Sequence, residues 1–373
     1  MNWLGDVLGI RLLLLLGSPA PLPPPLRVLE ALTDVEVTND VDGPGGFQLS
    51  FTLGRGPTLD YELLTLPALQ PPARVVLAVV PGAVPQALVN GVVTHHQVQV
   101  SDVPRASLLT VTGRDLTALM DLDERNEPCP NQSDSVIVQS ALARYARYGI
   151  VPAVTPTADV PLEVRRVPHQ RETDLALCRR LATANGFVFT VDPVAPGVSR
   201  AYWGPETRVS PPQPALTVGA GVAANATLGT SLDALAAQAP RGSFVDPVLK
   251  QVWPLPELPS LRQPPLAARS VPVLRTRLLR DTARADPLTA ALRAVAAATD
   301  TPEAVTATGE ADGIRYGHVL RVRGLVGVRG AGLSYDGIWF VRRVTHRLHR
   351  NSWTQSFRLS REGLGALTPV VTP

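Results

Sequence analysis

The sequence predicts an α+β protein that is mostly β: a β barrel, a small α/β insert, a second β region and a long proline-rich arm. Three observations support this fold class. Apolar and polar residues alternate along several short segments near both ends of the chain. Two segments in the middle repeat apolar residues at the helical spacing of about 3.6. A stretch rich in proline separates the later β segments.

The first β region is expected to occupy residues 1–113. Leu12 to Leu16 form an unbroken apolar run that predicts a buried strand ending at Gly17. The same stretch resembles a secretion signal, but Asp6 and Arg11 argue against one, and the run is far too short to span a bilayer. Cleavage as a signal peptide stays open as an alternative.

Other segments of this region read clearly as strands. Gly46 to Gly54 alternates apolar and polar residues, which predicts a half-buried strand. Arg74 to Val80 is a continuous β-branched run, so it should be covered on both faces. Two more strands follow at residues 91–100 and 107–113. Short strands at this spacing favour a barrel or a sandwich.

The α/β insert is expected at residues 114–205. It begins with a short helical piece and a proline-broken loop that ends at Pro128. The next segment predicts a helix capped by Ser133 or Asp134 and stopped by Gly149. Tyr145 and Tyr148 keep the helical spacing of its apolar face.

A second helix and a strand complete the insert. Thr173 or Asp174 caps the helix, and Asn185-Gly186 ends it. Apolar residues then alternate as a strand that Asp192-Pro193 should terminate. The buried stripe of the helix is predicted to contain Leu177, Cys178, Leu181 and Ala184, and the strand to bury Phe187, Phe189 and Val191.

The second β region is expected at residues 206–250 and 310–365, and the arm with a short helix at residues 251–309. Trp253 to Pro272 predicts an extended arm, and Pro287 to Asp300 predicts a helix with proline in its first turn. Arginines alternate with apolar residues in three closing segments, which predicts one packed face and one charged outer face. These segments are His318–Val328, Gly337–Arg350 and Trp353–Gly363.

Composition excludes several classes of site. Cys129 and Cys178 lie far apart without a CxxC pattern, so neither a disulfide framework nor a zinc site is expected. His95 and His96 are adjacent on a strand and cannot easily share one metal ion. The net charge is only +3, with no basic run or aromatic stacking pattern, so nucleic-acid binding is not expected.

Two segments with suggestive composition also lack residues that a catalytic or ligand-binding site would need. Gly324 to Gly337 is glycine-rich, but it lacks the Lys-Ser/Thr of a phosphate-binding loop, so turns between strands explain it better. Asp121 to Glu127 is acidic, but Arg125 stands where a calcium loop needs a ligand. The sequence therefore predicts no catalytic residue, no cofactor and no metal site.

Three segments in order resemble the late control gene D and baseplate-hub family of phage tails and related contractile injection systems. They are "GRDLTALMDLDE", "QSDSVIVQSALARYARYGIVPAV" and "HQRETDLALCRRLATANGFVFTVDP". "EVTNDVDGPGGFQLSF" and "IWFVRRVTHRLHRNSWTQSFRLSREG" resemble the branch found in extracellular injection particles. The family motif falls on Thr173, Asp174, Leu177, Leu181, Asn185, Gly186, Phe187 and Phe189.

The resemblance implies a structural function without enzymatic activity. Its members form homotrimers in which each chain contributes two small tube-like β barrels, so that a ring of near six-fold symmetry joins a hexameric inner tube to a trimeric spike. Partners would be the inner tube protein, a separate spike protein and other baseplate components. Assembly would take place in the cytoplasm, with the protein then part of an intracellular or released particle and not inserted in a membrane.

Two other classes of function stay open. Cell-wall hydrolases are found on tail hubs, so a peptidoglycan hydrolase is the leading alternative, although no fused lytic domain is evident. A secreted or surface β-rich binding protein would follow if the first residues were a true signal peptide.

Overall fold

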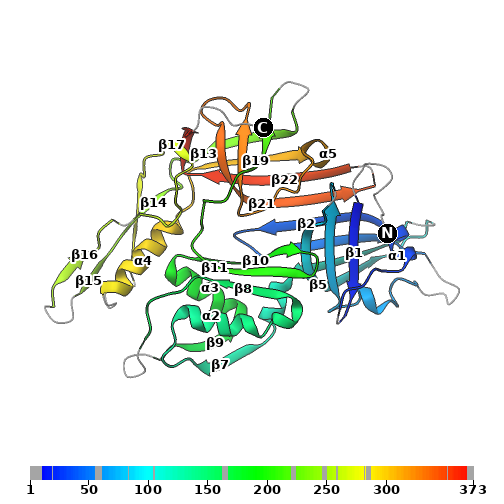
Figure 1. Cartoon of the computed structure of the whole chain (residues 1–373), viewed down its shortest axis with the longest axis horizontal. Helices are drawn as coiled ribbons and strands as arrows, with labels where there is room; N and C mark the ends of the chain where they lie inside the picture. Colours follow the sequence, from blue (N-terminus) through cyan, green and yellow to red (C-terminus); the bar gives the residue numbers. More distant parts are fainter. Residues whose placement is uncertain are drawn as a thin grey trace.

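A single β-sheet runs through most of the molecule in the computed structural model (Figure 1). The fold is α+β and mostly β, as the sequence predicts. The structure describes residues 11–367 apart from 19, 55–60, 83, 104–105, 162–166, 220–223, 246–249, 258, 281, 283–286 and 351. The first ten residues, where the signal-peptide alternative rests, lie outside this part of the chain.

The first half of the sheet contains six strands from the N-terminal region. In sheet order they are β1 (Arg11–Gly17), β4 (Arg74–Val80), β5 (Gln86–Gln99), β6 (Leu108–Asp115), β3 (Gly46–Thr52) and β2 (Leu32–Asp40). The helix α1 (Leu26–Ala31) and the 3-10 turn η1 (Pro67–Leu69) lie between them in sequence. The leucine run forms β1 as predicted, and every residue of β4 except Val80 is buried.

The second half of the sheet contains the C-terminal strands and two strands that follow the insert. They are β21 (Gly337–His349), β22 (Ser352–Arg361), β19 (Val305–Asp312), β13 (Ala226–Leu232), β20 (Leu325–Arg329) and β12 (Gln213–Thr217). A short helix, α5 (Gly313–Tyr316), follows β19. The strand predicted at His318–Val328 is wrong in its first part, since only residues from Leu325 onward pair.

The two halves join through one strand, β21. Its C-terminal part, Arg343–His349, pairs with Asp34–Asp40 of β2. Its N-terminal part, Gly337–Phe340, pairs with β20 along the same edge. Between these parts the register with β22 shifts at Arg342, which marks a β-bulge. The bulge therefore lies where the sheet passes from one half to the other.

Each half curls around its own apolar core. In the first half β1 crosses β2 steeply (Figure 1). The inward side chains of both strands belong to one buried apolar cluster. A separate cluster fills the second half around Trp339 and Phe357. Pairing among the described strands leaves both halves open rather than closed. Leu348 and Trp353, from β21 and β22, pack into the first core and couple the halves.

The insert packs two helices against a three-stranded sheet. The helices are α2 (Asp134–Ala143) and α3 (Asp174–Asn185), and the sheet order is β10 (Val188–Ala195), β11 (Val198–Gly204) and β8 (Ile150–Val154). Two 3-10 turns, η2 (Leu116–Asp121) and η3 (Ala146–Tyr148), flank α2. A further pair of strands, β7 (Glu124–Pro128) and β9 (His169–Thr173), lies outside the helices (Figure 1).

Four local predictions for the insert are wrong. The helix predicted to continue to Gly149 ends at Ala143, and the 3-10 turn η3 follows it. Ala184, predicted to lie in the buried stripe of α3, is exposed. Residues Glu124–Pro128 form β7 rather than a loop, because their main chain pairs with the segment that leads into α3. The strand after α3 continues past Asp192-Pro193 to Ala195, since a register shift between Pro193 and Ala195 accommodates the proline. The predicted helix caps are confirmed for Ser133 and Thr173.

One buried amide fastens the insert to the first half. The Asn90 side chain, on β5, is 2% exposed. Its Nδ2 donates to the carbonyl oxygens of Ala195 and Val198 at 3.2 and 2.9 Å, and its Oδ1 accepts from the amide of Gly197 at 3.0 Å. The Asn90 side chain therefore provides hydrogen-bond partners for main-chain groups in the tight turn between β10 and β11, which would otherwise be unpaired.

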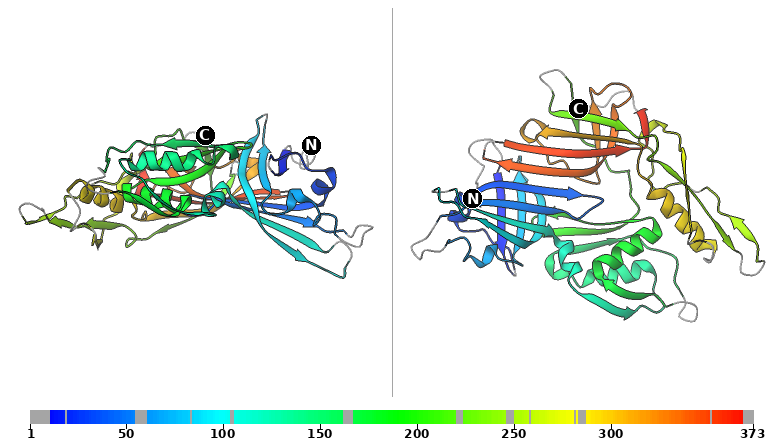
Figure 2. Two further views of the ribbon diagram at one scale, coloured as in Figure 1. Left: turned by 90° about the horizontal axis from the view of Figure 1, so that it is seen from below. Right: turned by 180° about the vertical axis from the view of Figure 1, so that it is seen from behind.

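The arm projects from the second half of the sheet, on the side away from β1 (Figures 1 and 2). The helix α4 (Pro287–Thr299) forms as predicted and contacts α3. The proline-rich segment is paired at several points rather than free. The paired strands are β14 (Gln238–Arg241) with β18 (Arg275–Leu278), β15 (Ser243–Val245) with β16 (Val252–Pro254), and β17 (Ala267–Ser270) with β23 (Gly363–Ala366).

Leu348 tests the coupling of the two halves. Its side chain is 0% exposed and lies in the core of the first half although it belongs to β21. We expect Leu348→Ala to lower the free energy of unfolding by about 2–5 kcal/mol, because the cavity lies at the join. Leu333→Ala is the control, since Leu333 is 88% exposed. Equal effects of the two substitutions in denaturant unfolding would contradict this coupling.

Candidate functional site

The residues predicted to carry the family motif lie on α3, next to its two ends and at the start of β10. Thr173 caps α3, its Oγ1 accepting from the amide of Ala176 at 3.2 Å. Leu177 and Leu181 are buried in the core of the insert, as predicted. Phe187 meets the Trp203 ring edge-on at 4.8 Å between centroids. Phe189 is half-buried against the same core.

Asp174 is a buried carboxylate at the first position of α3. Its side chain is 1% exposed. Arg144 donates to its Oδ1 at 2.7 Å, Gln170 to the same oxygen at 2.8 Å, and Tyr145 to its Oδ2 at 2.9 Å. Burial, together with this carboxylate, raises the pKa of Tyr145. Asp174 therefore ties α2, β9 and α3 together.

The end of α3 contacts α4 of the arm. Asn185 Nδ2 donates to Asp134 at 2.7 Å and to the carbonyl of Leu181 at 2.8 Å. Gly186 has φ +67°, and a Cβ there would lie 2.9 Å from the Cα of Ala296. Both the left-handed backbone and the close approach of α4 thus require glycine. These motif residues pack in the core of the insert or cap α3. Within the described part of the chain, their contacts include no catalytic group.

Cys178 also belongs to this packed region. It is 0% exposed on the inner face of α3, and neither it nor Cys129 is in a disulfide. Burial in apolar surroundings raises the pKa of the Cys178 thiol, which leaves it unreactive.

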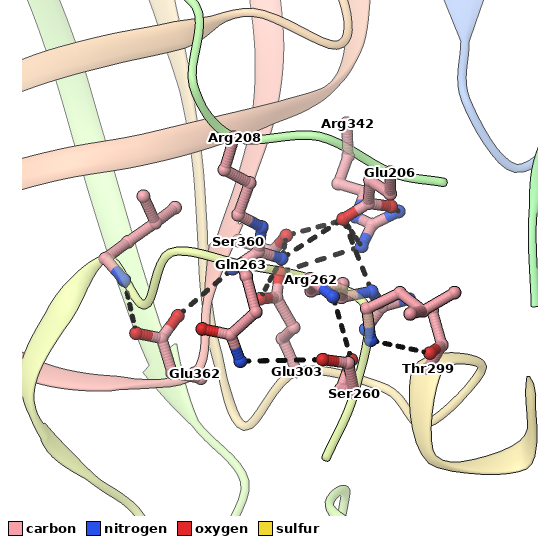
Figure 3. Close-up of polar contacts among 12 residues, drawn as sticks. Glu206, Arg208, Ser260, Arg262, Gln263, Thr299, Glu303, Arg342, Ser360 and Glu362 are labelled. Atoms are coloured by element: carbon pink, nitrogen blue, oxygen red, sulfur yellow. Dashed lines mark hydrogen bonds and ion pairs between the residues drawn. The ribbon is translucent and has the colours of Figure 1, made fainter. Parts of the chain in front are cut away.

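A buried ionic network lies where the arm, the insert and the second half of the sheet meet (Figure 3). We call it the junction network. It contains three arginines and three glutamates from segments far apart in sequence. They are Glu206, Arg208, Arg262, Glu303, Arg342 and Glu362.

Arg208 is the central cation. Its side chain is 1% exposed. It donates to Glu303 at 2.5 Å, to Glu206 at 3.1 Å and to Glu362 at 3.2 Å. Its guanidinium also lies over the Phe340 ring, 5.4 Å from the centroid. Burial acts to lower the pKa of Arg208, but Glu303 and Glu206 outweigh it and raise the pKa.

Arg342 enters the network from the bulge in β21. It donates to Glu206 at 3.0 Å, lies 3.7 Å from Glu303 and reaches the exposed Asp42 at 3.4 Å. Its main-chain carbonyl accepts from the amide of Val41, just past the end of β2. The bulge thus directs one arginine inward while the neighbouring Arg343 remains exposed.

The arm and the last strand complete the network. Arg262 of the arm lies 3.3 Å from Glu206 and donates to the carbonyl of Thr301 at 2.6 Å. Ser360 of β22 hydrogen-bonds to Glu303. Glu362 Oε1 accepts from the amides of Leu266 and Ala267, at 2.5 and 2.7 Å. The arm is therefore fixed to β22 by both charge and main-chain hydrogen bonds.

The junction network contains equal numbers of positively and negatively charged side chains. Burial acts to raise the pKa of Glu303, but Arg208, Arg342 and Arg262 outweigh it and lower the pKa from its ordinary value. Burial lowers the pKa of Arg262. Three cations facing three carboxylates, with most hydrogen bonds made, is the arrangement in which buried charges are tolerated. It makes a fixed joint between segments rather than a reactive centre.

The sequence interpretation missed the junction network. It placed the arginines of the closing strands outside, and this is wrong for Arg342 and Arg361, which are 8% and 0% exposed. Arg361 instead donates to the carbonyls of Ser334 and Asp336 and lies over Trp339. The doublet Arg342-Arg343 interrupts the alternation of β21, and that interruption was the available signal of a bulge.

No metal or membrane site was found in the described part of the chain. No three His, Cys, Asp or Glu side chains among the described residues are placed to hold a metal ion. No helix there is both long and apolar enough to cross a membrane. His346 is buried and His349 exposed, as expected of residues on opposite faces of a strand.

Solved structures of tail proteins share this fold. A tail protein from Neisseria meningitidis MC58 matches with a TM-score of 0.62 at 15% identity, over 95% of this chain and 98% of its own. The 43 kDa tail protein of prophage MuSo2 from Shewanella oneidensis matches with the same TM-score at 14% identity, over 95% and 98%.

A third structure comes from a secretion system. The E. coli c3393 protein, a component of the type VI secretion system with structural similarity to the T4 tail proteins gp27 and gp5, matches with a TM-score of 0.54. Its identity is 14%, over 92% of this chain and 77% of that one. No protein-family model and no curated protein sequence matches the chain. At these identities the comparisons show the fold: that of phage tail proteins and a type VI secretion component.

Removal of Arg208 tests whether the junction network stabilises the protein. Arg208→Met leaves Glu206 and Glu303 buried with too few cations, so we expect a loss of about 3–5 kcal/mol in the free energy of unfolding. Arg241→Met is the matched control, because the Arg241 side chain is 65% exposed and lies 3.8 Å from Glu257, which is 77% exposed. A loss of less than about 1 kcal/mol for Arg208→Met, measured by denaturant unfolding, would refute a stabilising network.

The pH dependence of stability gives a second test. Because the folded-state pKa of Glu303 is lowered, its contribution is present above the unfolded pKa of about 4.5 and is lost as the pH falls through the folded value. We therefore expect Glu303→Gln to be less stable than the parent at neutral pH and to lose less of its stability upon acidification. Parallel curves of stability against pH for the two proteins would rule this out.

Proposed function

We propose that the chain is a structural hub protein in the baseplate of a contractile injection particle, of the late control gene D and baseplate-hub family. Two independent lines support this. Three sequence segments resemble that family in the correct order. The fold of tail proteins extends over nearly the whole chain, including the insert and the arm.

The observation that carries the proposal is the joining of two β units by one strand pair, β2 with β21. Three such chains would present six β units around an axis. That number suits a hexameric inner tube on one side, while the three-fold axis suits a trimeric spike on the other. The proposed role is thus a homotrimeric symmetry adaptor, with a separate spike protein and other baseplate components as further partners.

The buried apolar clusters support a division of the chain into three domains and an arm. We propose a first β domain at 1–113, an insert at 114–205, a second β domain at 206–250 and 310–365, and an arm at 251–309. Separate buried clusters fill the first three of these. The pairing of β14 with β18 and of β15 with β16 suggests that the arm draws residues 238–245 into its structure.

The proposed role is architectural and needs no catalysis or cofactor. Charged side chains buried at the junction network hold segments together, and the motif residues of α3 pack and cap. Assembly in the cytoplasm, followed by residence in an intracellular or released particle, fits a tail component. A cell-wall hydrolase is the alternative that an activity assay must address.

Native mass spectrometry tests the proposal. We expect the purified chain, whose mass is 39.7 kDa, to form trimers and to bind the inner tube and spike proteins of its own particle. Incubation with peptidoglycan should release no soluble fragments. A chain that stays monomeric with both partners present, or that releases muropeptides, would overturn the assignment.

A further inference from the structure

A groove in the arm and an acidic knob on the insert have complementary chemistry. The groove has a volume of about 730 Å³ and lies between the end of α3, the helix α4 and the strand β18. We call it the arm groove. The residues that define its character are Arg277, Leu278, Arg280, Arg293, Ala296 and Ala297.

The arm groove is basic and partly apolar. Leu278 is 70% exposed although it is a large aliphatic side chain. Arg280 is exposed and makes no ion pair within the described residues, while Arg277 lies 3.9 Å from Asp300, which is itself 70% exposed. Two more exposed apolar residues, Val273 and Leu274, directly precede β18 in sequence. Exposed apolar side chains gathered in one segment mark an interaction site.

The acidic knob consists of Asp121 to Glu127, which includes the end of η2, the short turn after it and most of β7. Leu122 at its tip is 71% exposed. Asp123 and Glu124 follow Leu122 in sequence, are exposed, and have no ion pair within the described part of the chain. The knob therefore carries one large apolar side chain surrounded by carboxylates, which is the chemical complement of the arm groove.

The two surfaces lie at opposite ends of one helix. Asp121 accepts a hydrogen bond from Thr173, the N-cap of α3, at 2.9 Å. Thr183 and Ala184, near the C-terminus of α3, line the arm groove. A helix of 12 residues spans about 18 Å, so the knob cannot enter the groove of its own chain.

We propose that the acidic knob of one copy inserts into the arm groove of the next copy. Leu122 fits between Leu278 and the small residues of α4, and the carboxylates pair with the arginines at the rim. Two different surfaces that complement each other form a head-to-tail contact, the kind that closes into a ring. This inference rests on the proposed trimer and identifies one contact that would hold it together.

Charge reversal with rescue tests the contact. We expect Arg277→Glu with Arg280→Glu to raise the dissociation constant of the oligomer at least about tenfold, and Asp123→Arg with Glu124→Arg to do the same. The chain that carries all four substitutions should return to within a few-fold of the parent. Native mass spectrometry and sedimentation give the oligomeric state, and circular dichroism checks that each variant folds.

The control is Arg269→Glu with Arg358→Glu. It reverses the charge of two exposed arginines outside the groove, as the groove variant does within it. It should leave the oligomer intact. If the groove variant remains a trimer, or if the control dissociates equally, the contact is refuted while the proposed function stands. If the parent chain itself never forms a trimer, the proposed function fails, and this inference fails with it.

Discussion

The buried ionic network at the β21 bulge is the constraint on which the rest of the structure depends. The bulge lets β21 pair with β20 in its first part and with β2 in its second. It also turns Arg342 inward, onto Glu206. The same few residues therefore set the path of the sheet, the exit of the chain from the insert and the attachment of the arm.

Burial of charged groups, complete for Glu206 and Arg208 and partial for Glu362, is a costly way to hold segments together. An apolar core of equal volume is often at least as stable, because the arginines and glutamates lose their hydration on folding. What the network provides here is a defined geometry, since each guanidinium has fixed hydrogen-bonding directions. A protein that must present an insert and an arm at set positions to its neighbours benefits from such a joint.

The sequence was informative where local chemistry determines structure. Thr173, Gly186 and the leucine run of β1 follow capping, left-handed backbone and burial rules that act over a few residues. The sequence was misleading where contacts with distant segments determine the local structure. Glu124–Pro128 became a strand because β9 lies beside it, and Arg342 became buried because glutamates at positions 206 and 303 surround it. No pattern within Glu124–Pro128 indicates that partner strand, and the Arg342-Arg343 doublet signals a bulge without identifying the distant glutamates that surround Arg342.

The central claim is that the two β halves and the junction network form one cooperative unit. Amide hydrogen exchange in β2 and β21, the strands that join the two halves, tests this claim most directly. Peptides covering residues 34–40, 206–208 and 340–349 should exchange with the same, high protection, since each can open only when the whole joint opens. Exchange of β2 and β21 well before the cores of the two halves would show that they move independently, and would contradict the account.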